Sequence, residues 1–285
     1  MSKPDFLYHY TSIESLAMIL KNRTIRFNKL SKTDDLEESM TGDLNNIGRF
    51  IYVSCWTNNS AESIPLWHIY SEKLSGVRIK LPFIPFKNYV NEYYNDSRFS
   101  HGENLKSIDD VKIKLYLPFE YLNNNLCHFL ALFKYDDHDN KFEVQYTDDN
   151  LLIKPNVLLE GQGQVRIDFG NVGKYKRACW AFQEEWRYRI QAIPLSVQKY
   201  MDSTIGEKEI QNCINKIVSD YEIPLDHIDL VIDDEAFMKM EVTKGPGMTI
   251  GQELLLDAIM KMYNKDAKIS DSSLKGKIKN KGVIR

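Results

Sequence analysis

One segment near residue 190 constrains the fold more than any other part of the sequence, because it alternates polar and apolar residues one by one. Side chains alternate across a β-strand, so one face of such a strand would carry the polar set, Glu185, Arg187, Arg189 and Gln191. The opposite face would carry the apolar set, Trp186, Tyr188, Ile190 and Ala192. We therefore predict a strand over residues 185–192 with an ionic face and a core face.

Short strands and helices alternate through the first 82 residues. Aromatic and β-branched runs predict strands at residues 6–10, 24–27, 50–57 and 77–81. Apolar spacing predicts helices at residues 11–22 and 64–74, the first begun by a capping box in Thr11-Ser12-Ile13-Glu14. The same rules predict helices at residues 207–221, with Ile210 inward, and 250–262, and a strand at 227–233. This order, with short connections, predicts an α+β fold.

The middle of the chain gives weaker signals. Residues 83–160 are polar and irregular, with candidate strands at 130–135 and 142–146. We predict a single domain over residues 1–285, with core motifs at 6–82 and 165–285 and an insertion or lobe at 83–160. The length supports this prediction, because 285 residues can bury a sizeable core without a metal or disulfides.

The composition excludes several classes of protein. Thirty-seven Lys and Arg residues against 40 Asp and Glu give a net charge of -3, so no global field attracts nucleic acid or anionic lipid. The four cysteines include no CxxC pair, so we expect reduced thiols and no metal site. Because we find neither a signal peptide nor a run of roughly 18 apolar residues, we expect a cytoplasmic protein with no membrane association.

The C-terminal residues 265–285 are a local exception, with seven basic and two acidic residues. Within this segment, lysine occupies every second position at Lys275, Lys277, Lys279 and Lys281. This pattern is typical of a solvent-facing edge strand and equally of a basic tail. A tail of this kind would be a candidate for local binding of nucleic acid.

Three features exceed what core packing requires. His9 lies inside an aromatic run just before the first predicted helix, where site residues are common. Trp67 and Tyr70 are neighbours on the second predicted helix and could wall a pocket for a flat ring. Glu185 begins the alternating strand among aromatic residues, where a carboxylate could stabilise positive charge on a substrate. Each has an ordinary alternative: a structural histidine, packed core aromatics, and an ion pair of Glu185 with Arg187, Arg189 or a lysine.

Several short motifs occur in a definite order along the chain. They are Leu7-Tyr8-His9-Tyr10-Thr11-Ser12, then Trp67-x-x-Tyr70 followed by Gly76-Val77, then Lys176 and Trp180 leading to Glu185-x-Arg187. This order resembles the bacterial domain-of-unknown-function family numbered twenty-nine seventy-one. Asp34 and Glu37 match the family's Asn-Asp-Pro-aromatic-Glu pattern, whereas Thr33 and Asp35 depart from it. Gln183 stands where relatives usually have Glu.

That family is similar in turn to the ADP-ribosyltransferase superfamily. The likeness implies a mixed or antiparallel sheet core flanked by helices, with NAD as the substrate. It implies that His9 and Thr11 bind ribose, that Tyr70 or Trp67 lies over the nicotinamide, and that Glu185 is the catalytic carboxylate.

The same likeness assigns Gln183 and Glu185 to a Gln-x-Glu signature that orients the acceptor. Tyr10 and Arg187, next to these positions, are further candidates for substrate binding. No metal would be required, because a carboxylate beside the ribose stabilises the oxocarbenium-like centre of the transition state.

The leading hypothesis is a transferase that moves ADP-ribose from NAD to a macromolecule, either a protein or a nucleic acid, in a toxin or anti-phage defence system. An NAD glycohydrolase is the close variant. The alternative is a non-catalytic module that senses a nucleotide or binds a protein on the same fold, and Gln183 favours it. Under the leading hypothesis, Glu185→Gln would abolish NAD turnover and change stability by no more than about 1 kcal/mol.

Overall fold

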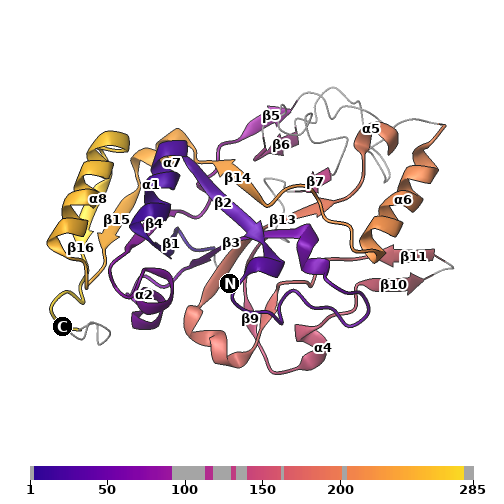
Figure 1. Cartoon of the computed structure of the whole chain (residues 1–285), viewed down its shortest axis with the longest axis horizontal. Coiled ribbons are helices and arrows are strands. Elements are labelled where there is room, and N and C mark those ends of the chain that lie inside the picture. The colour runs from indigo at the N-terminus through magenta and orange to yellow at the C-terminus, as the bar shows by residue number, and fades with distance from the viewer. Residues whose placement is uncertain are drawn as a thin grey trace.

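The computed structural model describes residues 3–91, 113–117, 130–132, 140–161, 164–200 and 204–278. Within these residues a ten-stranded sheet forms the centre of the molecule, and helices flank it (Figure 1). The predicted α+β class is therefore confirmed.

The large sheet is mixed but mostly antiparallel. Its described strands are β1 (Phe6–Thr11), β2 (Thr24–Lys29), β3 (Ile51–Thr57), β4 (Val77–Pro82), β7 (Leu130–Leu132), β8 (Lys141–Glu143), β13 (Glu185–Ile193), β14 (His227–Val231), β15 (Glu241–Lys244) and β16 (Lys268–Asp271). They follow the order β14-β2-β3-β1-β4-β15-β16, and β13 joins β3, β7 and β8. The pair β15 and β16 is parallel.

Short ribbons and helices complete the described structure. The ribbons pair β5 (Tyr89–Asn91) with β6 (Ile113–Leu115), β9 (Gln145–Tyr146) with β12 (Tyr175–Lys176), and β10 (Leu158–Gly161) with β11 (Gln164–Ile167). The α-helices are α1 (Ile13–Asn22), α2 (Ile64–Tyr70), α4 (Asn150–Ile153), α5 (Val197–Tyr200), α6 (Gly206–Val218), α7 (Asp234–Met238) and α8 (Ile250–Tyr263). The 3-10 helices are η1 (Leu30–Lys32), η2 (Ile47–Phe50) and η7 (Ala178–Gln183). None of the described helices is long and apolar enough to cross a membrane.

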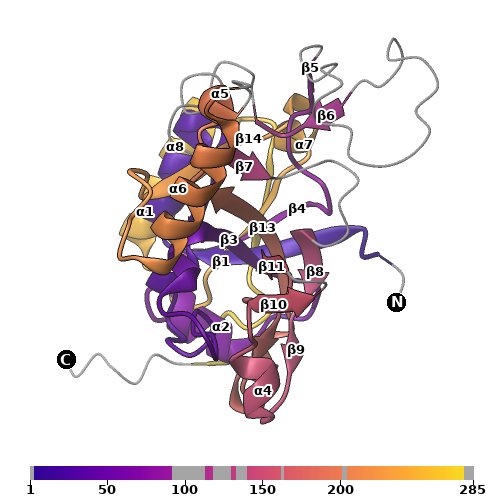
Figure 2. The ribbon, with the colours of Figure 1, turned by 90° about the vertical axis from the view of Figure 1, so that its right-hand side faces the viewer.

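The core lies between the sheet and the helices on one side of it. Figure 2 shows α1, α6 and α8 gathered along that side. Leu16 of α1 and Leu256 of α8 are buried in one cluster with Ile79 of β4 and Val242 of β15. Because β1 lies in the same cluster and pairs with β4 over its whole length, its register is fixed.

The central strand β3 has an uneven set of neighbours. β13 pairs with the whole length of β3, so β1 and β2 must share the other edge. β1 pairs there only at Thr57, and β2 pairs only at Tyr52 and Val53. Among the described strands, none pairs with residues 54–56 on that edge. The sheet therefore splits along the middle of β3, and α1 connects the two strands that diverge.

Two predicted helix ends are wrong. Ser12, rather than Thr11, caps α1, because the Ser12 side chain accepts a hydrogen bond from the backbone of Ser15. The predicted capping box of Thr11 and Glu14 is therefore wrong, because Ser15, and not Glu14, is the third residue after the cap. α2 ends at Tyr70, before the predicted end, because residues 72–74 have left-handed backbone angles that no α-helix can continue.

The burial of two predicted faces, on α6 and on β13, also differs from the expectation. Ile210 of α6 is exposed, and Glu209 is buried instead, because its carboxylate accepts a hydrogen bond from the Ser196 N–H at 2.8 Å. The three charged residues on the ionic face of β13 are as buried as its apolar face, whereas Gln191 on that face is half-buried. Carbonyl groups cover the ionic face: Arg187 donates to Gly173 and Arg189 to Gly170, each at 2.9 Å.

The predicted insertion is joined to the core, because β7 and β8 pair with β13 of the large sheet. The candidate strand at 142–146 is divided between β8 and β9, and residues 133–135 of the other candidate lie outside the described residues.

Of the two alternatives for the alternating lysines, the edge strand does not form in the described part, where residues 273–277 form turns. Lys275 donates to Glu253 at 3.0 Å and to Asp271 at 3.2 Å, so acids of the chain itself neutralise it. Residues 279–285 lie outside the described residues.

Core packing on β13 gives a matched test. Ile190 is 0% exposed, whereas Ile250 at the start of α8 is 81% exposed. We expect Ile190→Ala to lower the free energy of unfolding by about 2–5 kcal/mol, because it leaves a cavity in the core. Ile250→Ala should change it by less than about 0.5 kcal/mol. Urea unfolding curves measure both, and equal losses would contradict the described core.

Candidate functional site

A cavity of about 560 Å³ lies at the split in the sheet. Residues of β1, α1, β2 and β3 line it, together with the start of β13. Its volume falls within the range of about 300–1,000 Å³ that is common for small-molecule sites. Residues 54–56, which have no strand partner on this edge among the described residues, are all part of the cavity lining.

His9 lies on β1 in the cavity wall. Its Nδ1 is 2.9 Å from the carbonyl oxygen of Cys55, and its ring centre is 5.0 Å from that of Trp56. Burial lowers the pKa of His9 more than the Cys55 hydrogen bond raises it, so the ring is neutral at pH 7. A carbonyl oxygen only accepts hydrogen bonds, so Nδ1 carries the proton. His9 therefore has Nε2 as an acceptor for a hydroxyl group.

Tyr70 connects two sides of the cavity wall. Its hydroxyl donates to Asp34 Oδ2 at 2.5 Å and accepts from Gln183 Nε2 at 2.7 Å. The Gln183 oxygen accepts from Lys176 Nζ at 2.9 Å, which fixes the orientation of the amide. Burial, assisted by Asp34, raises the pKa of Tyr70, so the hydroxyl stays protonated. These contacts hold the ring of Tyr70 in one position at the cavity.

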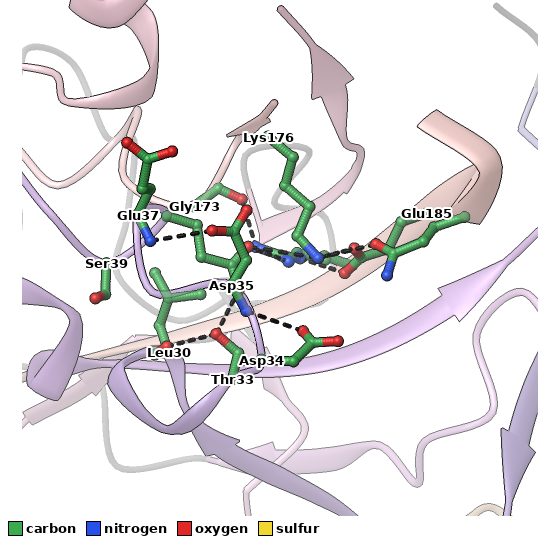
Figure 3. A network of polar contacts seen from close by, with 12 residues as sticks. Leu30, Thr33, Asp34, Asp35, Glu37, Ser39, Gly173, Lys176 and Glu185 are labelled. Carbon is green, nitrogen blue, oxygen red and sulfur yellow. Dashed lines mark hydrogen bonds and ion pairs between the residues drawn. The ribbon is translucent and has the colours of Figure 1, made fainter. Parts of the chain in front are cut away.

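Glu185 begins β13 within a buried group of charges. One oxygen accepts from Arg187 Nε at 2.5 Å, and the other accepts from Lys176 Nζ at 2.9 Å. Arg187 also binds Glu38 at 2.5 Å, and Lys176 lies 3.7 Å from the same Glu38 oxygen. Figure 3 shows the Lys176 amine directed toward Glu185. We call these four residues, Glu38, Lys176, Glu185 and Arg187, the ion network.

The two carboxylates of the ion network titrate differently. Burial would raise the pKa of Glu185, but Arg187 and Lys176 outweigh burial and lower it to about 2. Burial raises the pKa of Glu38 by more than Arg187 and Lys176 lower it. Glu185 is therefore the carboxylate that stays ionised in the ion network.

The structure brings together most of the residues that the sequence singles out. Seven of them line the cavity: His9, Tyr10, Thr11, Tyr70, Gln183, Glu185 and Arg187. Trp67 is not part of the described cavity wall, because it is fully buried and its indole donates to Glu62 at 2.9 Å. Tyr10 uses its hydroxyl to accept a hydrogen bond from the Ser63 N–H at 3.0 Å. Tyr70 is therefore the aromatic side chain of α2 that a ligand would meet.

Three side chains of the site have no role in the sequence-based prediction. They are Asp34, which binds Tyr70, and Glu38 and Lys176, which belong to the ion network. The acidic run at residues 34–38 is a sequence signal for Asp34 and Glu38, and the motifs that include Asp34 and Lys176 are a second signal. Within the described residues, no group of three or more His, Cys, Asp or Glu side chains is arranged to hold a metal ion.

The ion network changes the expected effect of Glu185→Gln on stability. The substitution leaves Lys176 and Arg187 with Glu38 as their remaining carboxylate, and breaking a buried pair costs about 3–5 kcal/mol. This exceeds the loss of about 1 kcal/mol expected for a site residue outside such a network. Because folding lowers the pKa of Glu185, its stabilisation is present above its ordinary titration range and is lost as the pH falls toward 2.

Urea unfolding of the parent and Glu185→Gln should therefore show a difference that shrinks between about pH 7 and pH 3. Glu184→Gln is the matched control, because Glu184 is exposed and adjacent. It should stay within about 0.5 kcal/mol of the parent. A gap between parent and Glu185→Gln that is independent of pH would contradict the lowered pKa.

Comparisons with known proteins give no information on the function of this chain. No family model, no curated protein and no solved structure matches this chain. The motif resemblance and the cavity that joins its residues are therefore the observations from which a function is proposed.

Proposed function

We propose that the cavity binds NAD and that the protein is an ADP-ribosyltransferase-like enzyme. The observation that carries the proposal is the meeting of His9, Tyr70 and Glu185 at one cavity, although they are far apart in the sequence. The order of the motifs around these residues motivates NAD as the ligand. The acceptor of ADP-ribose would be a protein, a nucleic acid or, in a glycohydrolase, water, and toxin or anti-phage systems are settings for such an activity.

The proposed reaction breaks the bond between the ribose carbon and the nicotinamide nitrogen. The bonding electrons leave with nicotinamide, and the acceptor then forms a bond to the same carbon and loses its proton. Positive charge develops on the sugar in between, and ionised Glu185 would stabilise it. His9 Nε2 would accept a hydrogen bond from a ribose hydroxyl, and the Tyr70 ring would hold the nicotinamide.

We propose the cytoplasm as the setting of this reaction, as expected from the sequence.

The first experiment measures NAD consumption by the purified protein and identifies nicotinamide and ADP-ribose among the products. We expect turnover in the parent and in Glu184→Gln. His9→Ala and Glu185→Gln should lose at least about 99% of it, the loss typical of groups that act in the transition state. Circular dichroism at the assay temperature must show that each variant is folded. Equal turnover in the parent and the folded variants would contradict the proposal.

A second candidate is a module that binds NAD or ADP-ribose without consuming it. The observation that favours it is that Glu185 is 4% exposed and that a cation binds each of its carboxylate oxygens. Gln183, the departure from the family pattern, is likewise held by Lys176 and Tyr70. Calorimetric binding of ADP-ribose to a parent without turnover would support this candidate.

Tyr70 allows a test of nucleotide binding that is independent of turnover. Tyr70→Ala removes the ring, whereas the matched Tyr70→Phe removes only the hydroxyl that binds Asp34 and Gln183. Stacking on an aromatic ring is worth about 1–3 kcal/mol, so Tyr70→Ala should weaken NAD binding by roughly five- to 150-fold. Tyr70→Phe should weaken it much less. Equal losses in a calorimetric titration would show that the hydroxyl, and not the ring, is the important contact.

A further inference from the structure

Thr33 lines the cavity and contacts Glu38, which lies in the same loop. The Thr33 hydroxyl is 2.7 Å from the Leu30 carbonyl oxygen and also lies within hydrogen-bonding distance of Glu38 Oε1. Figure 3 draws its contact with Leu30. A hydroxyl has one proton, and the Leu30 carbonyl also accepts from the Thr33 N–H at 3.3 Å. Thr33 therefore donates to an ionised Glu38 or, when its proton goes to Leu30, accepts from a protonated Glu38.

The surroundings of Glu38 make its protonation state important. Its side chain is buried, and its second oxygen binds Arg187 and faces Lys176. The same cations bind Glu185. The ion network therefore has a net charge of about +1 when Glu38 is protonated and about zero when it is ionised.

We propose that Glu38 is a positioning residue that sets the charge of the ion network, and through it the ability of Glu185 to stabilise a cationic sugar. This inference rests on the proposed function. Protonated Glu38 leaves the network positive, which favours an anionic group such as the diphosphate of a dinucleotide. Ionised Glu38 cancels that charge, so Glu185 can act on the positive charge of the transition state.

The groups that face Glu38 come from four parts of the chain. Thr33 precedes it in the same loop, Lys176 lies on β12, and Arg187 and Glu185 lie on β13. Cys55 of β3 also responds to the negative charges of Glu185 and Glu38, which add to the effect of burial in raising the pKa of its thiol. Cys55 lines the cavity and can therefore report on the charge of the network.

Glu38→Gln tests the proposal because it keeps the shape of a protonated Glu38. We expect turnover to fall about ten- to 100-fold, because one buried charge near the reacting sugar is lost. The dissociation constant for ADP-ribose should stay within about threefold or become smaller, since the network remains positive. In the parent, turnover should rise with pH as Glu38 ionises, and this rise should be absent in the variant. A folded variant with the turnover and pH profile of the parent would overturn the proposal.

Thr33→Val tests the assignment of the proton. If Thr33 accepts a hydrogen bond from protonated Glu38, its removal destabilises the protonated form, and the rise in turnover moves to lower pH. If Thr33 instead donates to an ionised Glu38, the rise moves to higher pH. Either shift would support Glu38 as the group whose ionisation controls turnover, and an unchanged pH profile would overturn it.

Alkylation of Cys55 separates this proposal from the proposed reaction, because it needs no NAD. Iodoacetate and iodoacetamide both react with the thiolate, so the ratio of their rates cancels the thiolate fraction and reports the local charge. Mass spectrometry of the Cys55 peptide measures each rate, with Cys55→Ser as the control for peptide assignment.

In the parent, the ratio of iodoacetate to iodoacetamide should fall as the pH rises and Glu38 ionises, whereas in Glu38→Gln it should stay constant. This result in a protein without NAD turnover would uphold the role of Glu38 in setting charge and reject the enzymatic function. The same ratio at every pH in both proteins would overturn the role of Glu38.

Discussion

The buried attraction between Arg187 and its two carboxylates, Glu38 and Glu185, is the interaction on which the site depends. Moving charges out of water costs several kcal/mol for each ion, so the group is stable only because each charge has close partners of opposite sign. These pairs connect the loop after η1 to β13, and Lys176 adds β12 to the same group. One set of charges thus joins three segments, each of which contributes residues to the cavity lining.

The backbone supplies the space that these charges border. A fully paired β3 would have closed its edge with ladder hydrogen bonds, and no cavity could have formed there. Because β1 and β2 pair only with the two ends of that edge, residues 54–56 have no strand partner there among the described strands, although β13 pairs with their other edge. α1 then crosses between the two strands and closes one side. The site is therefore a product of strand register as much as of side chains.

The sequence was informative where structure is local. Alternation predicted β13, and apolar spacing predicted α1 and α8, because these signals depend on neighbouring residues. Alternation could not show that Arg187 and Arg189 are buried, since their cover comes from carbonyl groups of residues 169–173, a segment without periodicity. Trp67 and Tyr70 show the same limit for the site: both lie on α2, but tertiary packing alone decides that Trp67 faces Glu62 and Tyr70 faces the cavity.

The hydrogen bond from His9 to Cys55 has a consequence for how this site can change in evolution. The partner of the ring is a main-chain carbonyl, so any residue at position 55 that preserves the path of β3 supplies the same acceptor. The position of the imidazole proton therefore depends on the backbone path of β3 and not on the identity of one side chain. Drift in the side chains of β3 would leave the acceptor nitrogen of His9 in place, whereas a shift in strand register would remove it.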